Sequence, residues 1–422
     1  MRATKNSGFE WIGEIPTSWE LYKGKYMFTQ RNLRGNTIEL QLLSPTQKYG
    51  VVPQSVYEDR SGMNAVKLNE NANLSALKTI HKGDFCISLR SFQGGFEYSE
   101  YEGVVSPAYQ VFYPVVKVAR GYYKYLFKDS GFIEKMNSYT MTLRDGKNIA
   151  FADFGNTYIP CPPVDEQQRI ADFLDAKCAE IDALTADIQT QINTLEQYKR
   201  SVITETVTKG LNPATEMKDS GIEWVGQMPL AWDVVPNKYL MYKVKNICPV
   251  YNGEDILSLT TNGVIIRDLN GGGKMPTSFD GYQKVTPGNL LMCLFDIDVT
   301  PRCIGLVKNF GLTSPAYSQF VMRTGAYAPY YYYYYLMVDY TKELLHMAKN
   351  LRHSLTEDQL GAIKAPNPPC EEQVQIAEFL DKKCVEISRV IEDKNKQLAT
   401  LDEYKKSLIF EYVTGKKEVP LS

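Results

Sequence analysis

The chain has 422 residues, of which 44% are hydrophobic and 12% aromatic, and its formal net charge at pH 7 is −2. This composition excludes a disordered chain, and the length predicts about two or three domains. The net charge is unusual for a basic nucleic-acid binder, but it is unevenly distributed: +4 in residues 1–163, −4 in 164–209, 0 in 210–369 and −2 in 370–422. The positive charge belongs to the two globular segments, of which the second is neutral overall, and the other two segments are acidic. This distribution is compatible with DNA on one surface and proteins on another.

The sequence gives no sign of a membrane protein, a secreted protein or a metal-binding protein. The chain has no apolar run of about 18 residues and no charged-then-apolar signal pattern near its first residue, so we expect a cytoplasmic protein. The eight cysteines form no C-x-x-C pair, and only three histidines accompany them. These counts argue against a zinc site and against a disulfide scaffold.

The first segment, residues 1–163, is expected to fold as a mixed β and α domain. It opens with SGFEWIGEIPTSW at residues 7–19 and closes with Pro162 and Pro163. Alternating apolar residues at 82–89 and 103–115 predict short strands. The tyrosine-rich stretch that begins at Arg120 predicts an amphipathic helix.

Residues 164–210 predict one long helix. The two prolines block helix continuation upstream, Asp165 can cap the first turn, and Gly210 ends the helix. Apolar residues recur at spacings of three and four and predict a buried stripe, which comprises Ile170, Phe173, Leu174, Ile181, Leu184, Ile188, Ile192, Leu195, Tyr198 and Val202.

The same pattern then returns. SGIEWVGQMPLAW at residues 220–232 repeats the opening motif, and PPCEEQVQIAEFLDKKC at 368–384 repeats PPVDEQQRIADFLDAKC at 162–178, with 11 of 17 positions identical. We interpret this as an internal duplication. The second domain is residues 211–369, and a second helix lies within residues 370–422. The six tyrosines at 330–335 could stack on bases, but their alignment with the first tyrosine-rich stretch favours helix packing.

The fold class predicted is α+β, with two mixed β/α domains separated by two long helices. A single apolar stripe along such a helix has to be buried, and the other helix is the obvious partner. We therefore expect an antiparallel coiled coil within the chain, and pairing with a separate protein is the competing interpretation.

A search for catalytic motifs is negative. The chain has no Walker loop, no H-E-x-x-H, no G-x-S-x-G and no strand-linked G-x-G-x-x-G. NGGGK at residues 270–274 lacks the ending of a phosphate loop, and the acidic pair in FDIDVTP, residues 295–301, is followed by no lysine at nuclease spacing.

Two variable segments, each followed by a long helix that begins PP-x-x-EQ-x-x-IA-x-FLD, resemble the specificity subunits of type I restriction-modification systems. The resemblance covers essentially the whole chain. It implies two target-recognition domains, spaced by the coiled coil along double-stranded DNA, and a bipartite asymmetric target. It also implies two modification (methyltransferase) subunits and restriction subunits as partners, which hold S-adenosylmethionine, ATP and Mg. This chain is then expected to bind no cofactor or metal and to be non-catalytic by itself.

Candidate DNA-binding residues are charged or amide side chains in turn-rich parts of each recognition segment. Arginine suits bidentate contact with guanine or phosphate, and we rank Arg144 and Arg352 highest because each lies shortly before a Pro-Pro boundary. The full set is Arg31, Arg34, Arg90, Gln93, Arg144, Lys147, Lys274, Arg302, Lys349, Arg352 and His353.

The repeated first-turn residues Glu166, Gln167, Glu372 and Gln373 are the candidate docking sites for the methyltransferase subunits. Side chains in a first helical turn are usually exposed, and compensation of the helix dipole explains glutamate better than glutamine. A coiled-coil scaffold that binds only proteins remains the alternative to a DNA reader, and a steep salt dependence of DNA binding would separate the two.

Overall fold

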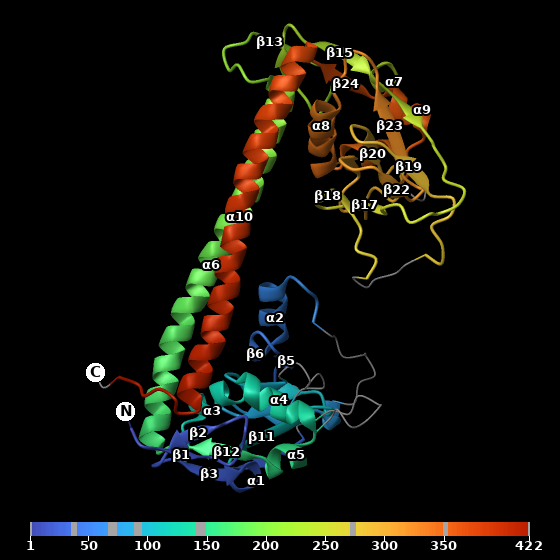
Figure 1. The fold of residues 1–422 in the computed structure, drawn as a ribbon. Helices are drawn as coiled ribbons and strands as arrows, with labels where there is room; N and C mark the ends of the chain where they lie inside the picture. The colour runs from blue at the N-terminus through green and yellow to red at the C-terminus, as the bar shows by residue number, and fades with distance from the viewer. Residues whose placement is uncertain are drawn as a thin grey trace. The chain divides into compact units, whose positions relative to one another are not determined.

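The computed structural model describes residues 2–34, 40–65, 74–87, 95–139, 149–270, 276–348 and 353–420. The candidate residues Arg90, Gln93, Arg144, Lys147, Lys274, Lys349 and Arg352 lie outside these ranges. The chain forms two compact units (Figure 1). Unit 1 comprises residues 1–188 and 396–422, and unit 2 comprises residues 189–395.

Unit 1 is built on a four-stranded antiparallel sheet in the order β4-β11-β8-β9. Two-stranded pairs surround it: β1-β2, β3-β12, β5-β6 and β7-β10. The strands are β1 (Thr4–Asn6), β2 (Glu14–Pro16), β3 (Glu20–Lys23), β4 (Phe28–Gln30), β5 (Leu43–Thr46), β6 (Gly50–Pro53), β7 (Lys78–Ile80), β8 (Phe85–Ile87), β9 (Phe96–Tyr98), β10 (Gly103–Val105), β11 (Gln110–Pro114) and β12 (Tyr158–Cys161). The short helices are α1 (Gly24–Met27), α2 (Gln54–Ser61), α3 (Arg120–Leu126), α4 (Ser130–Ser138) and α5 (Phe151–Asn156).

Unit 2 repeats this plan strand for strand. Its four-stranded sheet has the order β16-β23-β20-β21, and its pairs are β13-β14, β15-β24, β17-β18 and β19-β22. The strands are β13 (Met217–Asp219), β14 (Gln227–Pro229), β15 (Asp233–Pro236), β16 (Met241–Val244), β17 (Leu257–Thr260), β18 (Gly263–Ile266), β19 (Gln283–Val285), β20 (Leu290–Met292), β21 (Ile304–Leu306), β22 (Gly311–Thr313), β23 (Ser318–Met322) and β24 (Lys364–Asn367). The short helices are α7 (Asn237–Leu240), α8 (Ala328–Tyr340) and α9 (Glu357–Ala362). The duplication inferred from sequence is therefore also a duplication of topology.

The two cores use different aromatic residues. In unit 1, Phe28 makes edge contacts with five other aromatic rings, including Phe85 and Phe112, at centroid distances of 5.2 to 5.9 Å. In unit 2 the tyrosine run lies in α8, where Tyr330, Tyr331 and Tyr334 are fully buried. The preference for helix packing over base stacking is confirmed for these tyrosines.

Two long helices, α6 (Val164–Lys209) and α10 (Cys370–Val413), link the repeats. Their contacts run in opposite directions: in unit 1, Phe173 stacks on Tyr412 with centroids 4.5 Å apart, and in unit 2, Lys199 donates to Ser388 Oγ at 2.8 Å. The predicted antiparallel pairing within the chain is confirmed, and Figure 1 shows both helices.

The predicted apolar stripe is only partly right. Ile170, Leu174 and Ile181 are buried, but Leu184 is 47% exposed and Tyr198 is 54% exposed. A pair of helices buries a narrow seam, whose members are spaced alternately three and four residues apart. The buried seam steps by four residues from Leu174 to Cys178 and from Ile188 to Ile192. The step after Ile181 is also four, so Leu184 falls outside the buried contact, and Tyr198, two heptads later, falls outside it for the same reason.

Glycines end both long helices, as the sequence predicts. Gly210 and Gly415 each have a φ of +74°, the left-handed conformation that a residue with a side chain adopts only with strain. Among the described residues, no helix is both long and apolar enough to cross a membrane.

Candidate nucleic-acid interface and docking sites

Arg31, which follows β4, is the most firmly held of the described DNA-binding candidates. Its Nε and Nη2 donate to the two carboxylate oxygens of Asp84 at 2.6 and 3.1 Å, and Asp84 is fully buried. The guanidinium also lies over the ring of Tyr113, 4.2 Å from its centroid. This bidentate pair uses the N–H groups of Nε and Nη2 on one side of the guanidinium. A DNA contact of Arg31 stays a prediction, and only the remaining N–H groups are available for it.

The other described candidates are more open. Arg34 is exposed and forms an isolated backbone bridge with Lys78. The side chain of His353 is 46% exposed, and its Nε2 lies 3.9 Å from a carboxylate oxygen of Asp298. Arg302 is half-buried beside Tyr332; burial raises the pKa of that tyrosine, and Arg302 opposes the rise. Their role in base contact stays a prediction.

The glutamines at the starts of the long helices are completely buried, so the expected exposure of these first-turn residues is wrong. Gln167 Oε1 accepts from the backbone N–H of Ala119 at 2.9 Å, and its Nε2 donates to Pro162 O at 2.7 Å. Gln373 repeats both bonds, accepting from the N–H of Tyr327 at 2.7 Å and donating to Pro368 O at 2.8 Å. Each helix thus starts inside its unit, and the glutamine ties the start to the segment before α3 or α8.

The glutamates beside them also point inward. The indole N–H of the fully buried Trp19 donates to Glu166 Oε2 at 3.0 Å, and that of Trp232 donates to Glu372 Oε2 at 2.9 Å. In unit 1, Arg2 also pairs with Glu166. In each unit, therefore, the tryptophan of the opening motif donates a hydrogen bond to the glutamate at the start of the long helix.

Tyrosine hydroxyls complete the same anchor in both units. Tyr125 donates to Asp175 Oδ1 at 2.6 Å, and Tyr333 donates to Asp381 Oδ1 at 2.6 Å. Burial, together with the hydrogen bond to the carboxylate, raises the pKa of both hydroxyls, which keeps them as donors.

A second tyrosine in each unit binds the end of the opposite long helix. Tyr122 donates to the carbonyl of Val413 at 2.6 Å, and Tyr330 donates to the carbonyl of Val207 at 3.1 Å. Such carbonyls have no partner within the helix, so these bonds satisfy acceptors that would otherwise need water. Sequence reasoning missed these roles, although the repeated YY-x-Y spacing was a visible signal.

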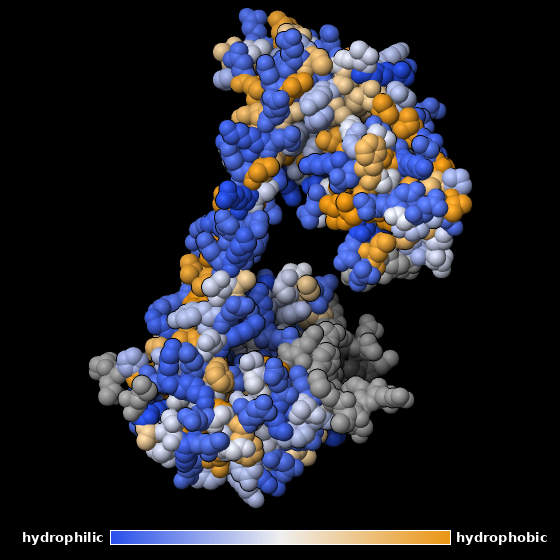
Figure 2. All heavy atoms as spheres, in the orientation of Figure 1, coloured by the Kyte–Doolittle hydropathy of each residue, from blue (hydrophilic) through white to orange (hydrophobic). Residues whose placement is uncertain are grey.

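The long helices expose two equivalent groups of residues, which we call the rod patches. The first comprises Lys177, Leu184 and Tyr404 in unit 1, and the second comprises Lys383, Val390 and Tyr198 in unit 2. Tyr198 and Tyr404 are each 54% exposed, and Leu184 and Val390 are 47% and 45% exposed. In Figure 2, scattered apolar residues interrupt the hydrophilic surface of these helices. The repeated YK-x-S motif could have pointed to the tyrosines, but the heptad pattern placed Tyr198 on the buried stripe.

The lysines of the rod patches lie beside these tyrosines. The hydrogen bond that Lys177 donates to Glu180 raises the pKa of Lys177, and Tyr404 adds to the rise. Lys383 donates to Glu386 in the same way, and Tyr198 adds to the rise in its pKa. Both rod patches therefore combine an ammonium, a phenol and an aliphatic side chain in similar surroundings.

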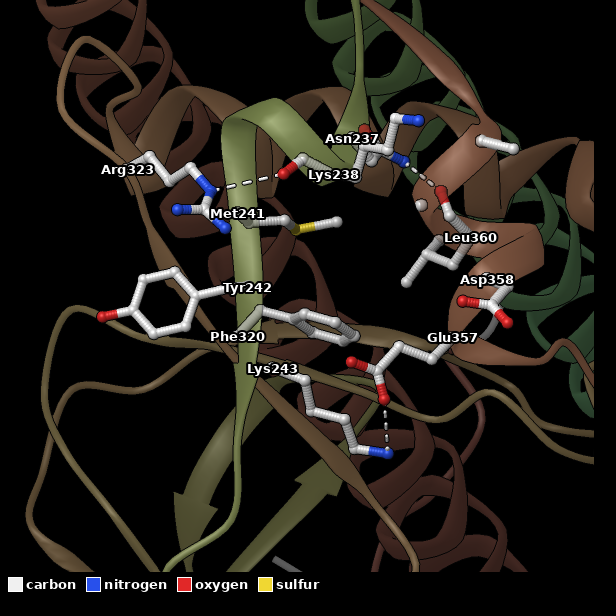
Figure 3. Close-up of a pocket in the computed structure, with 12 residues that line it drawn as sticks. Asn237, Lys238, Met241, Tyr242, Lys243, Phe320, Arg323, Glu357, Asp358 and Leu360 are labelled. Carbon is white, nitrogen blue, oxygen red and sulfur yellow. Dashed lines mark hydrogen bonds and ion pairs between the residues drawn. The ribbon is translucent and has the colours of Figure 1, made fainter.

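Unit 2 also contains a pocket of about 370 Å³ between α7, β16, β23 and α9 (Figure 3). Its walls carry Lys238, Lys243, Arg323 and Tyr242, and acidic side chains of α9 also line it. Arg323 Nε donates to the carbonyl of Lys238 at 3.2 Å, and its guanidinium lies 5.1 Å from the centroid of the Tyr242 ring. These contacts hold the arginine at the pocket mouth without a carboxylate partner among the described residues.

One buried carboxylate distinguishes unit 1. Glu97 in β9 is fully buried; its Oε1 accepts from Lys128 Nζ at 2.7 Å, while Oε2 has no partner among the described residues. Burial raises the pKa of Glu97 to about 7, although Lys128 opposes the rise. Near neutral pH this side chain is therefore divided between its neutral and charged forms.

Comparisons with known proteins agree with this architecture. Residues 17–194 match the family described as type I restriction modification DNA specificity domain. The type I restriction enzyme MjaVIII specificity subunit of Methanocaldococcus jannaschii is 26% identical over 306 residues, which cover 67% of this chain and 68% of that protein. The putative type I restriction enzyme MjaX specificity subunit of the same organism is also 26% identical, over 62% of this chain and 59% of that protein.

Solved structures share the fold. A chain from a study of complex assembly and conformational transition in a type I R-M system gives a TM-score of 0.70 at 14% identity, covering 96% of this chain and 99% of that one. The HsdS subunit from Thermoanaerobacter tengcongensis gives a TM-score of 0.50 at 14% identity, covering 96% and 98%.

The matched domain defines the class: this chain carries a DNA specificity domain of the type I restriction-modification kind. With its duplicated units and paired long helices, the chain is similar in sequence to type I restriction enzyme specificity subunits and shares the fold of solved type I R-M chains. Specificity subunits are generally non-catalytic.

Proposed function

We propose that this chain is a specificity subunit that reads a bipartite, asymmetric DNA target, with one half-site read by each unit, and docks two methyltransferase subunits together with restriction subunits. The observation that carries the proposal is that one topology occurs twice in the chain while the residues of the two copies differ. Two readers of one design, with different surface side chains, suit a target whose two halves differ in sequence.

The paired long helices support a fixed spacing between the readers. Half-sites in the major groove are commonly about 34 Å apart, one turn of DNA. The bonds from Gln167, Gln373, Tyr122 and Tyr330 tie the globular part of each unit to the portions of both long helices that belong to that unit. A flexible linker would leave that spacing undefined.

Base reading is assigned to the exposed candidates in turns, and phosphate contact to other cations nearby. Arg34, Arg302 and His353 are open to solvent in whole or part. Losing a direct base contact costs about 1 to 3 kcal/mol at one target position. Arg31 has a different expected role, because its pair with buried Asp84 positions the loop that follows β4.

Docking of the methyltransferase subunits is assigned to the rod patches. Exposed tyrosines flanked by apolar and charged side chains are typical centres of protein interfaces. Two equivalent patches suit two copies of one partner. Glu166, Gln167, Glu372 and Gln373 then contribute indirectly, because they fix the helix starts from which the patches project.

Catalysis is assigned to the partners. We expect S-adenosylmethionine on the methyltransferase subunits and ATP with Mg²⁺ on the restriction subunits. This chain would determine the DNA sequence at which these subunits act. The isolated chain, incubated with DNA and these cofactors, is expected to neither methylate nor cleave it.

A domain exchange tests half-site assignment. Replacing residues 20–160 with the recognition domain of another specificity subunit should change one half of the methylated motif and preserve the other half and the spacing. Genome-wide methylation mapping reads this directly. An exchange that altered both halves, or neither, would show that the units do not read separately.

Aspartate substitutions test docking. Tyr198→Asp places a charge in the second rod patch and should weaken one of two docking sites, so that native mass spectrometry shows a complex with a single methyltransferase subunit. The matched control is Gln197→Asp, the preceding residue, which projects about 100° away around the helix. Equal two-subunit complexes for both variants would remove the rod patches from the interface.

A further inference from the structure

A Lys–Tyr pair stands on the surface of both units at equivalent positions. Lys25 and Tyr26 lie in α1, and Lys238 and Tyr239 lie in α7. Tyr26 is 63% exposed and Tyr239 is 62% exposed, and each lysine lies over the ring of its neighbour, with Nζ 5.6 and 5.1 Å from the ring centroids. The same aromatic side chain is thus exposed at equivalent positions of both units.

Both lysines are seated in the same way. A Cβ added at Gly155 in α5 would lie 3.3 Å from Lys25 Cβ, and one added at Gly361 in α9 would lie 3.5 Å from Lys238 Cβ. The lysine stems therefore lie against α5 and α9 at these glycines. Among the described residues, neither ammonium has a carboxylate within ion-pair distance; Lys25 Nζ donates only to Asn156 Oδ1, at 3.2 Å.

The surroundings of the pair differ between the units. In unit 2 the pair stands beside the pocket of Figure 3, where Arg323, Lys243 and Tyr242 add charge and a second exposed ring. Their equivalents in unit 1, by the repeat alignment, are Val115, Gln30 and Thr29. The Lys–Tyr pair is therefore retained where its neighbours are not.

From this contrast we propose that the two Lys–Tyr pairs hold the sugar-phosphate backbone of double-stranded DNA, one pair at each half-site. The proposal rests on the DNA-reading function proposed above. Bases differ between two half-sites, so residues that read them must diverge, whereas the phosphate backbone is the same at both. An ammonium without an ion-pair partner and a phenol hydroxyl are both common phosphate ligands.

The distribution of charge around the Lys–Tyr pair of unit 2 favours DNA as its ligand. The second recognition segment is neutral overall, so attraction for a polyanion has to come from a local concentration of cations. At the pocket, Glu357 lies 3.5 Å from Lys243 and offsets it, which leaves Lys238 and Arg323 as the uncompensated cations. The exposed Asp358 is the remaining acid in the pocket lining and opposes a phosphate there.

The test uses the complex reconstituted with methyltransferase subunits and measures the affinity for target and scrambled duplexes across a salt series. Lys25→Ala and Lys238→Ala should each weaken both duplexes by roughly tenfold at low salt and lower the slope of log K against log salt by about 1. Tyr26→Phe and Tyr239→Phe should weaken both duplexes by a smaller factor. The matched control, Lys382→Ala on an exposed face of α10, removes the same charge and should leave the slope unchanged.

Asp358→Asn separates a phosphate contact from a folding defect, because it should tighten binding to both duplexes, and a folding defect cannot do that. Parent-like slopes for both lysine variants would overturn the proposal, as would weakened methyltransferase assembly with unchanged DNA slopes, which would assign the pairs to a protein interface. If the parent complex itself showed no preference for any sequence, the failure would lie with the proposed function and not with the pairs.

Discussion

The centre of β9 in unit 1 carries Glu97, whereas the equivalent strand of unit 2, β21, carries Gly305. Glu97 is buried against Lys128, but a Cβ at Gly305 would lie 2.5 Å from Val264 and 2.7 Å from Leu259. The same strand position thus holds a charged pair in one unit and no side chain at all in the other.

The anchors behave in the opposite way. The Trp–Glu, Gln–backbone and Tyr–Asp bonds recur with nearly equal lengths in both units. The two copies therefore share the bonds that attach each unit to the long helices. They differ in the side chains of the core at β9 and β21 and in the side chains of the surface.

The largest expected effect comes from breaking an anchor. Gln373→Ala leaves the N–H of Tyr327 and the carbonyl of Pro368 without their side-chain partner in a buried site, and we expect a loss of about 3 kcal/mol of stability in unit 2. Gln167→Ala should do the same to unit 1. Hydrogen exchange, followed by mass spectrometry, should show faster exchange confined to the unit that carries the change.

The control for this comparison is Gln375→Ala, which removes an exposed glutamine from the same helix. It should change exchange in neither unit. Uniform acceleration across both units after Gln373→Ala would mean that the two anchors do not act separately.

A second prediction is that pH changes the stability of unit 1 more than that of unit 2. The pKa of Glu97 is about 7 in the folded state and near 4.5 when unfolded, so folded Glu97 keeps a proton that the unfolded chain releases. Its stabilising effect is therefore present below about pH 4.5 and is lost as pH rises through 7. We expect unit 1 to lose about 2 to 3 kcal/mol relative to unit 2 between pH 5 and 8.

Glu97→Gln cannot ionise, so it should remove most of this pH dependence. Thermal unfolding and hydrogen exchange at pH 5 and 8 measure the effect. The prediction fails if the parent and the variant respond to pH equally, or if unit 2 responds as strongly as unit 1.

The smallest expected effect concerns a single hydroxyl. Tyr125→Phe and Tyr333→Phe each delete one bond of 2.6 Å to a carboxylate at the rod surface, and each should cost about 1 to 2 kcal/mol. The two bonds match in length, although Asp175 Oδ1 also accepts from Lys124 at 3.0 Å. The two losses should therefore be similar, as measured by denaturant midpoints at constant slope. A twofold difference between them would show that the anchors are less equivalent than their geometry.

The long helices could be predicted from local signals because proline, capping residues and glycine act within a few positions of the chain. The tyrosine run was assigned correctly because its repeat partner had a helical pattern. The burial of Gln167 and Gln373 could not be predicted in this way, since it depends on segments 46 to 48 residues earlier that fold over the helix start. Leu184 and Tyr198 were misplaced because apolar spacing alone does not distinguish the seam from the adjacent face.

The core of unit 1 includes Leu408, Tyr412 and Val413 from α10 beside Trp19 and Ile170. During synthesis on the ribosome, unit 1 therefore cannot complete its core until about two hundred further residues have been added to the chain. At roughly 5 to 20 residues per second, that interval is on the order of 10 to 40 seconds. Unit 2 is contiguous in the chain and can close earlier. Unit 1 is thus begun first and completed last, and until α10 is made the core residues that Leu408, Tyr412 and Val413 cover lack these partners.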